Sequence, residues 1–275
     1  NPFIEFSSEG DASKFESTLK VMSYNVRLFN AYEENSTVNV SETISEILES
    51  KNPDVVCIQE YYRDHKIDFS EYPFQYIHFR NKKDKAGVLK EHNLGHAILS
   101  KYPIVNRGAF HFKGTFNNSL YVDIIKAQDT IRVYNLHLQS MGILPKVSYL
   151  QEASTRRLLG RMSDGFIGQQ TQIQELLAHK ATSPYLVLVL GDFNNTPFSY
   201  VYREMNKNMK DAYLERGNGL GTTYLFDSYP MRIDYILASE RVDIVNFETI
   251  KKTFSDHYPI IATVGWSPIL QTEKD

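Results

Sequence analysis

Short runs rich in Val, Ile, Leu, Tyr and Phe recur along nearly the whole chain, and this recurrence constrains the fold more than any other feature. Such runs, bounded by polar and turn residues, are typical of β-strands. In IRVYNLHL, the side chains of Val133, Asn135 and His137 alternate with apolar ones and therefore share one strand face. We expect strands over residues 19–26, 54–60, 95–100, 120–127, 131–138, 185–193, 232–239, 242–250 and 258–266.

Three other stretches have helical character. Residues 41–51 carry apolar side chains at helical spacing behind Ser41, a suitable N-cap residue. Residues 146–180 are long, polar and rich in Gln, and residues 197–206 begin with Pro197, which suits a first helical turn. Many strands with a few helices between them favour a two-sheet α/β or α+β sandwich. Three glycines in residues 146–180 predict that this stretch breaks into two helices. They are Gly160, Gly165 and Gly168.

Nothing in the sequence divides the chain into separate units. It contains no internal repeat, low-complexity segment or Pro/Gly/Ser-rich linker, and 275 residues can enclose one large core. We therefore expect a single domain over residues 18–266, preceded by a tail or edge strand over residues 1–17. A C-terminal tail is expected over residues 267–275. No feature of the sequence predicts an obligate protein partner, so we expect a monomer.

The compartment stays open at this stage. Cys57 is the only cysteine, so the chain cannot form an internal disulfide that would indicate an oxidising environment. No apolar run reaches the roughly 18 residues that a membrane span needs. The chain begins with Asn1 rather than Met. We expect a soluble domain that is either secreted or the exposed part of a membrane-anchored precursor.

The strongest chemical signal is GDFNNTP at residues 191–197. Asp192 and Asn194 follow the apolar run YLVLVL two residues apart, and from such a strand end both side chains can enter one cleft. There an Asp can bind a metal or align a water molecule, and an Asn can stabilise an oxyanion. A turn whose Asp and Asn side chains serve only the backbone is an alternative of equal weight.

Two further signals also lie at the ends of apolar runs. Asp256 and His257 are adjacent and precede one run, and Glu60 closes the run DVVCIQ. A His beside a carboxylate suits general acid–base catalysis, and a carboxylate at a strand end suits a hard metal ion. Taken singly, a capped loop and a solvated strand end are the stronger interpretations of these residues.

Three more polar residues lie inside apolar runs. Asn25 in MSYNVRLFN needs hydrogen-bond partners if it is buried, and it can also ligate a metal through its carbonyl oxygen. Asp234 in RIDYILAS needs a partner, for which a histidine is the natural candidate. His137 alone is more typical of a structural histidine than of a catalytic one.

Together these residues form a more specific pattern. Carboxylates, asparagines and two histidines lie at strand ends between residues 25 and 257, without Cys/His metal spacing, a Gly-rich phosphate loop or a nucleophile elbow. Oxygen ligands without thiolates favour Mg²⁺ over Zn²⁺, with Mn²⁺ and Ca²⁺ as alternatives.

The ordered motifs SYNVR, CIQE, GHAILSKYPI, YNLHLQS, LGDFNNTP, RIDYIL and SDHYPI resemble those of the endonuclease/exonuclease/phosphatase superfamily over about residues 18–266. This resemblance implies a four-layer αββα sandwich of the deoxyribonuclease I type, with the active site at one edge of the paired sheets. It also implies hydrolysis of a phosphoester by an activated water molecule, with a divalent metal and no activity in chelator.

The resemblance further implies roles for the residues that match these motifs. Asn25, Glu60 and Asp256 would hold the metal, with Glu60 as the principal ligand. Asp192 would orient or deprotonate the attacking water, and Asn194 would contact the phosphoryl oxygens.

The remaining motif residues would handle charge and protons. Asp234 would orient His257, which would stabilise the developing phosphorane or act as the base. His137 would polarise the phosphate or protonate the leaving group. Arg27 stands where apurinic endonucleases place a second acid, which argues against abasic-site repair and makes Arg27 a candidate for phosphate binding.

We predict an endonuclease- or phosphodiesterase-like phosphodiester hydrolase, and two other classes of function stay open as alternatives. A nuclease or nucleotide phosphodiesterase acts on nucleic acid or nucleotides and needs a basic rim, but the formal net charge of −3 gives no general basic field. A solvated surface is the stronger interpretation of the local clusters. Those clusters are Lys82, Lys83, Lys85 and Lys90, expected in one loop, and Arg156, Arg157 and Arg161.

The second class is a sphingomyelinase- or phosphoinositide-phosphatase-like hydrolase of lipid or sugar phosphates. Action on a phospholipid would favour an exposed apolar hairpin, for which AFHFKGTF at residues 109–116 is the candidate. Phe110 and Phe112 share a strand face, however, so a core position is the stronger interpretation. The third class is a non-catalytic binding module.

Overall fold

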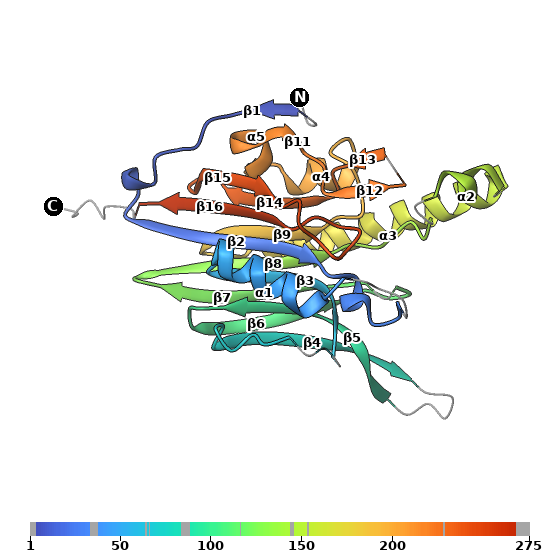
Figure 1. Cartoon of the computed structure of the whole chain (residues 1–275), viewed down its shortest axis with the longest axis horizontal. Coiled ribbons are helices and arrows are strands. Elements are labelled where there is room, and N and C mark those ends of the chain that lie inside the picture. Colours follow the sequence, from blue (N-terminus) through green and yellow to red (C-terminus); the bar gives the residue numbers. More distant parts are fainter. Residues whose placement is uncertain are drawn as a thin grey trace.

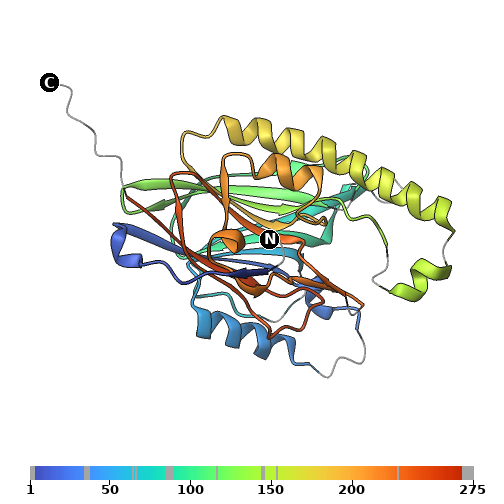
Figure 2. The ribbon, with the colours of Figure 1, turned by 90° about the horizontal axis from the view of Figure 1, so that it is seen from above.

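The computed structural model describes residues 4–33, 38–63, 65, 67–83, 89–115, 117–143, 146–152, 154–227 and 229–267. Two six-stranded sheets lie face to face, and the longer helices cover their outer faces (Figures 1 and 2). The expected four-layer αββα sandwich is therefore confirmed. Within the described part of the chain, no helix is both long and apolar enough to span a membrane.

The first sheet has the strand order β15-β16-β2-β3-β5-β4. Its members are β2 (Ser17–Asn25), β3 (Val55–Tyr62), β4 (Phe74–Lys83), β5 (Leu89–Ser100), β15 (Asp243–Thr249) and β16 (Ile260–Trp266). Strands β2 and β3 run parallel and are connected through helix α1 (Val40–Lys51), whereas the other pairs are antiparallel.

The second sheet has the order β10-β14-β9-β8-β7-β6. Its members are β6 (Ile104–His111), β7 (Asn118–Lys126), β8 (Asp129–His137), β9 (Leu186–Asp192), β10 (Met209–Asp211) and β14 (Asp234–Ser239). Here β8 and β9 are the parallel pair, and helices α2 (Val147–Glu152) and α3 (Thr155–Ala181) lie between them in sequence. In each sheet, the carboxyl ends of the parallel pair therefore meet at one edge.

Shorter elements complete the fold. Strand β1 (Ile4–Phe6) pairs with β11 (Asn218–Leu220), and β12 (Tyr224–Phe226) forms a hairpin with β13 (Tyr229–Met231). Helices α4 (Tyr200–Met205) and α5 (Ala212–Arg216) are short, as are the 3₁₀ turns η1 (Ala12–Lys14) and η2 (Arg27–Asn30). Most of the expected C-terminal tail, residues 268–275, lies outside the described residues.

Three apolar layers follow from the alternation of side chains along the strands. Leu19, Val133 and their neighbours fill the space between the sheets, and Ile44 and Ile47 of α1 pack on the outer face of the first sheet. Tyr134 and Leu136 face the other way from Val133 and pack against α3. The periodicity read from IRVYNLHL is therefore confirmed.

Each of the expected strands is present, but the described part of the chain also contains strands that were missed, namely β4, β6 and the three-residue strands β10, β11, β12 and β13. Strands β4 and β6 lie at the edges of their sheets, where partial exposure reduces the apolar content that marks a buried strand. The expectation of one loop for the lysine cluster is wrong, because Lys82 and Lys83 belong to β4 and Lys90 belongs to β5. Lys85 lies outside the described residues.

The helix boundaries also differ from those expected. The break in the long Gln-rich stretch precedes Ser154, the N-cap of α3, and the helix then continues through all three of its glycines. A Cβ atom at Gly165 would approach Met141 Sδ to 2.4 Å, and one at Gly168 would approach Gln139 Oε1 to 2.1 Å. These two glycines are therefore places where the segment after β8 packs closely on the helix.

Two other helices begin at residues different from those expected. Helix α1 starts at Val40 behind the N-cap Asn39, and α4 starts at Tyr200 behind the N-cap Ser199 rather than at Pro197. In both, the cap side chain accepts a backbone hydrogen bond from the third residue after it. This hydrogen bond satisfies an otherwise free amide and fixes the start of each helix.

Candidate active site

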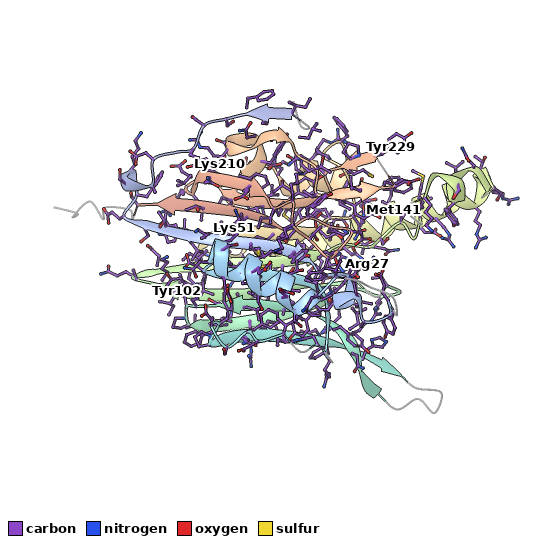
Figure 3. The ribbon with its side chains drawn as sticks, in the orientation of Figure 1. Arg27, Lys51, Tyr102, Met141, Lys210 and Tyr229 are labelled. Atoms are coloured by element: carbon purple, nitrogen blue, oxygen red, sulfur yellow. The ribbon has the colours of Figure 1, made fainter. Side chains whose placement is uncertain are left out.

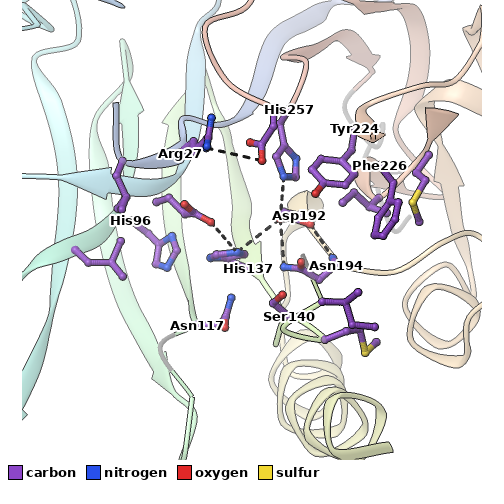
Figure 4. A pocket seen from close by; sticks show the side chains of 18 residues that line it. Arg27, His96, Asn117, His137, Ser140, Asp192, Asn194, Tyr224, Phe226 and His257 are labelled. Atoms are coloured by element: carbon purple, nitrogen blue, oxygen red, sulfur yellow. Dashed lines mark hydrogen bonds and ion pairs between the residues drawn. The ribbon is translucent and has the colours of Figure 1, made fainter. Parts of the chain in front are cut away.

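A pocket of about 520 Å³ opens at the edge where the parallel pairs of both sheets end (Figure 4). Its polar lining contains most of the residues that the motifs singled out. They are Arg27, Glu60, His137, Asp192, Asn194, Asp256 and His257, joined by His96, Asn117 and Ser140. The apolar lining consists of Leu28, Leu94, Met141, Ile143, Tyr224, Phe226, Met231 and Ile233.

Asp192, the last residue of β9, is at the centre of this arrangement. Its Cα is paired with that of His137 on the parallel strand β8 and with that of Asp234 on the antiparallel strand β14. The side chain is 1% exposed. Asp192 Oδ1 accepts a hydrogen bond from Asn194 N at 2.7 Å, and Oδ2 accepts from Asn25 Nδ2 at 3.1 Å and from Asn194 Nδ2 at 3.2 Å.

The residue before Asp192 explains how the strands approach so closely here. Gly191 has φ of +139°, and a Cβ at this position would lie 2.0 Å from the carbonyl oxygen of Leu136. Only glycine fits this backbone and this spacing. The Gly-Asp pair in LGDFNN therefore sets both the approach of β8 to β9 and the position of Asp192.

Glu60 enters the pocket from the other sheet. The register of β3 against β5 shifts between Ile58 and Tyr61, and Glu60 has φ of +55°, as a bulged residue does. Its Oε1 accepts from Asn25 Nδ2 at 3.3 Å and lies 3.8 Å from His137 Nε2. His137 Nε2 is also 3.6 Å from Asp192 Oδ2, so this histidine lies between two carboxylates.

His257 and Asp234 form a buried pair beside Asp192. His257 Nδ1 lies 3.0 Å from Asp234 Oδ2, and His257 Nε2 lies 3.8 Å from Asp192 Oδ2. The ring of Tyr224 contacts the His257 ring with centroids 4.7 Å apart. Because Asp234 occupies Nδ1, the Nε2 atom is the one that His257 directs toward Asp192 and the pocket (Figure 4).

The environment gives the two histidines different protonation states near neutral pH. Burial lowers the pKa of His257, but the Asp234 and Asp192 carboxylates outweigh it and raise the pKa to about 10. Burial, with the nearby His96 and His257, lowers the pKa of His137 well below its usual value. His257 is therefore a cation and His137 is neutral, which suits them to different tasks.

Burial disfavours the charged forms of the carboxylates in the pocket. Burial raises the pKa of Asp192 to about 7, with a further increase from Asp234 and a decrease from His257. Burial also raises the pKa of Glu60. A divalent cation beside these oxygens would stabilise their charged forms, so the donor set fits a hard metal ion. Glu60, Asp192 and Asp256 are the carboxylates that line the pocket.

Two asparagines use their amide groups within the protein. Asn25 Nδ2 donates to both Glu60 and Asp192, while its Oδ1 accepts from the backbone N of Arg27 at 3.0 Å. Metal ligation through Oδ1 would require this amide to turn over. Asn194 Nδ2 donates to Leu138 O at 2.9 Å as well as to Asp192. Their roles as metal ligand and phosphate contact stay predictions.

Arg27 and Asp256 lie together at the rim of the pocket. Arg27 Nη1 forms an ion pair with Glu33 Oε1 at 2.6 Å, and Arg27 Nε lies 3.9 Å from Asp256 Oδ2. Arg27 begins η2, whose four residues all have φ between +44° and +56°. This left-handed turn places the guanidinium beside the carboxylates instead of letting β2 continue. Phosphate binding by Arg27 stays a prediction.

A group of buried amides supports the site and was not identified from the sequence. Gln59 on β3 donates to Asn135 Oδ1 on β8 at 2.7 Å, and Asn135 Nδ2 donates to the Ile58 and Ala97 carbonyls at 2.9 Å each. The register shift of β3 begins beyond the Ile58–Ala97 pair. The signal was available, because an amide on an otherwise apolar strand face needs partners.

A second set of amides holds two loops of the pocket on α3. Gln169 is fully buried, and its Nε2 donates to Gln139 O at 2.8 Å and to Phe193 O at 3.2 Å. Its Oε1 accepts from Asn195 Nδ2 at 2.8 Å. Gln169 therefore ties the segment after β8 to the segment after β9. Gln169 lies on the same helix face as Ile173 and Leu176, and this position in the sequence could have indicated that its side chain is buried.

Comparison with known proteins adds a sequence family and a set of similar folds. The Endonuclease/Exonuclease/phosphatase family matches residues 22–257. No curated protein sequence matches the chain. The structure is similar to that of the endonuclease/exonuclease/phosphatase from Beutenbergia cavernae DSM 12333, with a TM-score of 0.67 and 16% identity, covering 91% of this chain and 72% of that one.

Two other solved structures have the same fold. The human Nocturnin catalytic domain with bound sulfate gives a TM-score of 0.63 at 18% identity, covering 90% of this chain and 94% of that one. Truncated TDP2 from Caenorhabditis elegans gives 0.61 at 20% identity, covering 90% and 98%. At these identities the similarity is one of fold.

Proposed function

The chain belongs to the Endonuclease/Exonuclease/phosphatase family, and from this premise we propose that it is a divalent-metal-dependent phosphodiester hydrolase that uses an activated water molecule. Members of this family are generally hydrolases of phosphoester bonds. One observation carries the proposal. Buried Asp192 lies within 4 Å of the Nε2 atoms of two histidines, His137 and His257, in a pocket that also contains Glu60.

In this proposal, the chain's own groups divide the reaction between them. Asp192 accepts a proton from the attacking water as the new P–O bond forms. Protonated His257, held by Asp234, stabilises the negative charge that grows on the phosphoryl oxygens, and neutral His137 donates a hydrogen bond to the phosphate or the leaving group. The ester P–O bond breaks, the departing oxygen takes up a proton from solvent water, and Asp192 returns its proton to solvent.

Glu60 and Asp256, with Asn25 if its amide turns over, would hold the metal ion. Mg²⁺ suits these oxygen donors best, and Mn²⁺ or Ca²⁺ are the alternatives. When bound, the ion acts as a Lewis acid on the phosphoryl oxygens. The proposed reaction needs no protein partner.

The test compares bis(p-nitrophenyl) phosphate with p-nitrophenyl phosphate in Mg²⁺, Mn²⁺, Ca²⁺ and excess chelator. We expect metal-dependent cleavage of the diester, little cleavage of the monoester, and none in chelator. His257→Ala and Asp192→Asn should each lose most of the turnover while circular dichroism shows the fold to be kept. Asp164→Asn on the exposed face of α3 is the control and should act like the wild type.

Other outcomes would select other functions. Preferential cleavage of the monoester would make the protein a phosphatase, and metal binding without turnover would favour a binding module. Undiminished cleavage in chelator would contradict the proposal. The expected membrane-inserting segment at residues 109–116 gives no support to the lipid alternative, because Phe110 and Phe112 are buried in the apolar layer between the second sheet and α3. Phe116 lies outside the described residues.

A further inference from the structure

The pocket has apolar walls around its polar centre. Met141 and Ile143 follow β8, and Phe226, Met231 and Ile233 belong to the hairpin β12–β13 and the residues just beyond it. Arg27, Met141 and Tyr229 are labelled at the same end of the molecule in Figure 3, which places the segment after β8 and the hairpin at this end. In Figure 4, Tyr224 and Phe226 lie beside His257 and Asp192, on the side away from His96.

The charges in the pocket do not suit a polyanion. Among the described residues that line it, Arg27 is the only Lys or Arg, and it is already paired with Glu33 and close to Asp256. Three carboxylates line the same space. Binding of a nucleic-acid backbone depends on several cations that neutralise successive phosphates, and the walls of this pocket do not supply them.

The group that lies against the apolar walls belongs to the same substrate molecule as the phosphate. The apolar walls and the catalytic groups line one continuous space of about 520 Å³, within the range of roughly 300–1,000 Å³ that small-molecule sites have. The apolar part of the lining is mainly aliphatic, formed by Leu, Ile and Met side chains that offer no hydrogen bond to a base edge. Burial of alkyl surface is the interaction that such walls provide.

We propose that the substrate is a phosphoester that carries an aliphatic chain, which lies against Phe226, Met231 and Met141 while its phosphate occupies the centre formed by Asp192, His137 and His257. This inference rests on the proposed phosphodiester hydrolysis and specifies the substrate class.

The hairpin provides a matched pair of variants. In β12, Tyr224 and Phe226 line the pocket, whereas Leu225 between them lines no part of it and is 37% exposed. The Cα of Phe226 pairs with that of Tyr229 and the Cα of Leu225 pairs with that of Pro230, so both residues are held by the same hairpin. Truncation at Phe226 removes a pocket wall, and truncation at Leu225 removes an equally placed surface side chain.

Three soluble diesters with the same leaving group test the proposal. They are methyl, octyl and thymidine 5′-p-nitrophenyl phosphate, each used below the concentration at which the octyl ester forms micelles. Each buried methylene is worth about fourfold in binding, so we expect kcat/KM for the octyl ester to exceed that of the methyl ester at least about tenfold. The octyl ester should also be cleaved faster than the thymidine ester.

The variants show whether the pocket causes this preference. Phe226→Ala should lower kcat/KM for the octyl ester about fivefold or more and that for the methyl ester less than about twofold. Leu225→Ala should change neither. Equal rates for the methyl and octyl esters, or a preference for the thymidine ester, would overturn the aliphatic substrate and leave the hydrolase proposal standing. Failure of all three esters with every metal would overturn both.

Discussion

Gln59 and Asn135 lie on different sheets and share a hydrogen bond of 2.7 Å next to residues that line the pocket. Gln59 precedes Glu60 on β3, and Asn135 lies two residues before His137 on β8. The contact therefore fixes the spacing between the two sheets at the point where a carboxylate from one sheet faces a histidine from the other.

Asn135→Leu should destabilise the fold. It leaves the Ile58 and Ala97 carbonyls without their amide donor, and each buried unsatisfied group costs about 1–3 kcal/mol. We expect the free energy of unfolding, measured with urea, to fall by about 2–5 kcal/mol. Asn246→Leu, at a half-buried position on β15, should cost less than about 1 kcal/mol. Equal losses for the two variants would remove the special role of Asn135.

Asp234→Asn tests the pair with His257. The carboxylate 3.0 Å from Nδ1 holds the ring and favours its protonated form. Replacing it should lower kcat by about 10²- to 10⁴-fold, as in other carboxylate-oriented histidines, with a smaller change in KM. The NMR titration of His257 should also move to lower pH. A variant with wild-type kcat would show that His257 needs no orienting carboxylate.

Gly191→Ala and Gly160→Ala should have opposite effects. A Cβ at Gly191 meets the Leu136 carbonyl at 2.0 Å, whereas a Cβ at Gly160 on α3 meets nothing within 4 Å. We expect Gly191→Ala to lower the free energy of unfolding by at least about 2 kcal/mol. Gly160→Ala should raise it by about 0.5–1 kcal/mol, because alanine favours the helix. Thermal or urea unfolding of both proteins checks the contrast.

His96 should make the protein sensitive to acid. Burial, with the nearby His78, lowers the pKa of His96 to about 3, whereas the unfolded side chain titrates near 6.5. Between these values the unfolded state binds the extra proton, so stability falls as the pH drops below about 6.5, by up to about 1.4 kcal/mol per pH unit. In urea unfolding at pH 5 and 6, His96→Gln should lose less stability than the wild type. Equal losses would contradict this assignment.

Metal binding should release protons from the site. Without metal, burial holds the pKa of Asp192 near 7, so the carboxyl is partly protonated at pH 6.5. A divalent cation would lower that pKa, and up to about one proton would leave per metal bound. Calorimetric titration with Mg²⁺ or Mn²⁺ in two buffers of different ionisation enthalpy measures this release. It should shrink at pH 8.5 and in Asp192→Asn. Proton uptake would contradict the assignment.

The sequence allowed the fold and most of the pocket to be predicted because both depend on local patterns. Apolar runs located the strands, and polar residues at their ends located Asp192, Asp256 and Glu60. What could not be predicted depends on contacts between distant segments. Met141 packs on Gly165 and Gln139 packs on Gly168 of α3, and no helix rule contains that information.

The orientation of the polar side chains also could not be predicted from the sequence. The motif around Asn25 indicates the residue but not which amide atom faces Glu60, because that depends on the turn at Arg27 and on the partner sheet. The sequence also does not indicate that Met141, Phe226 and Met231 line one pocket, because Met141 is at least 85 residues away from the other two, which the hairpin carries.

The site lies at the ends of strands from both sheets. Activity therefore requires that both sheets have folded. Asn25 lies at the end of β2, His257 lies just before β16, and these two strands are neighbours in the first sheet, while Asp192 is on the second. A folding intermediate with one finished sheet would hold only part of the proposed catalytic set. In a refolding experiment, turnover should therefore return with the slowest phase, after the spectroscopic signal of the strands.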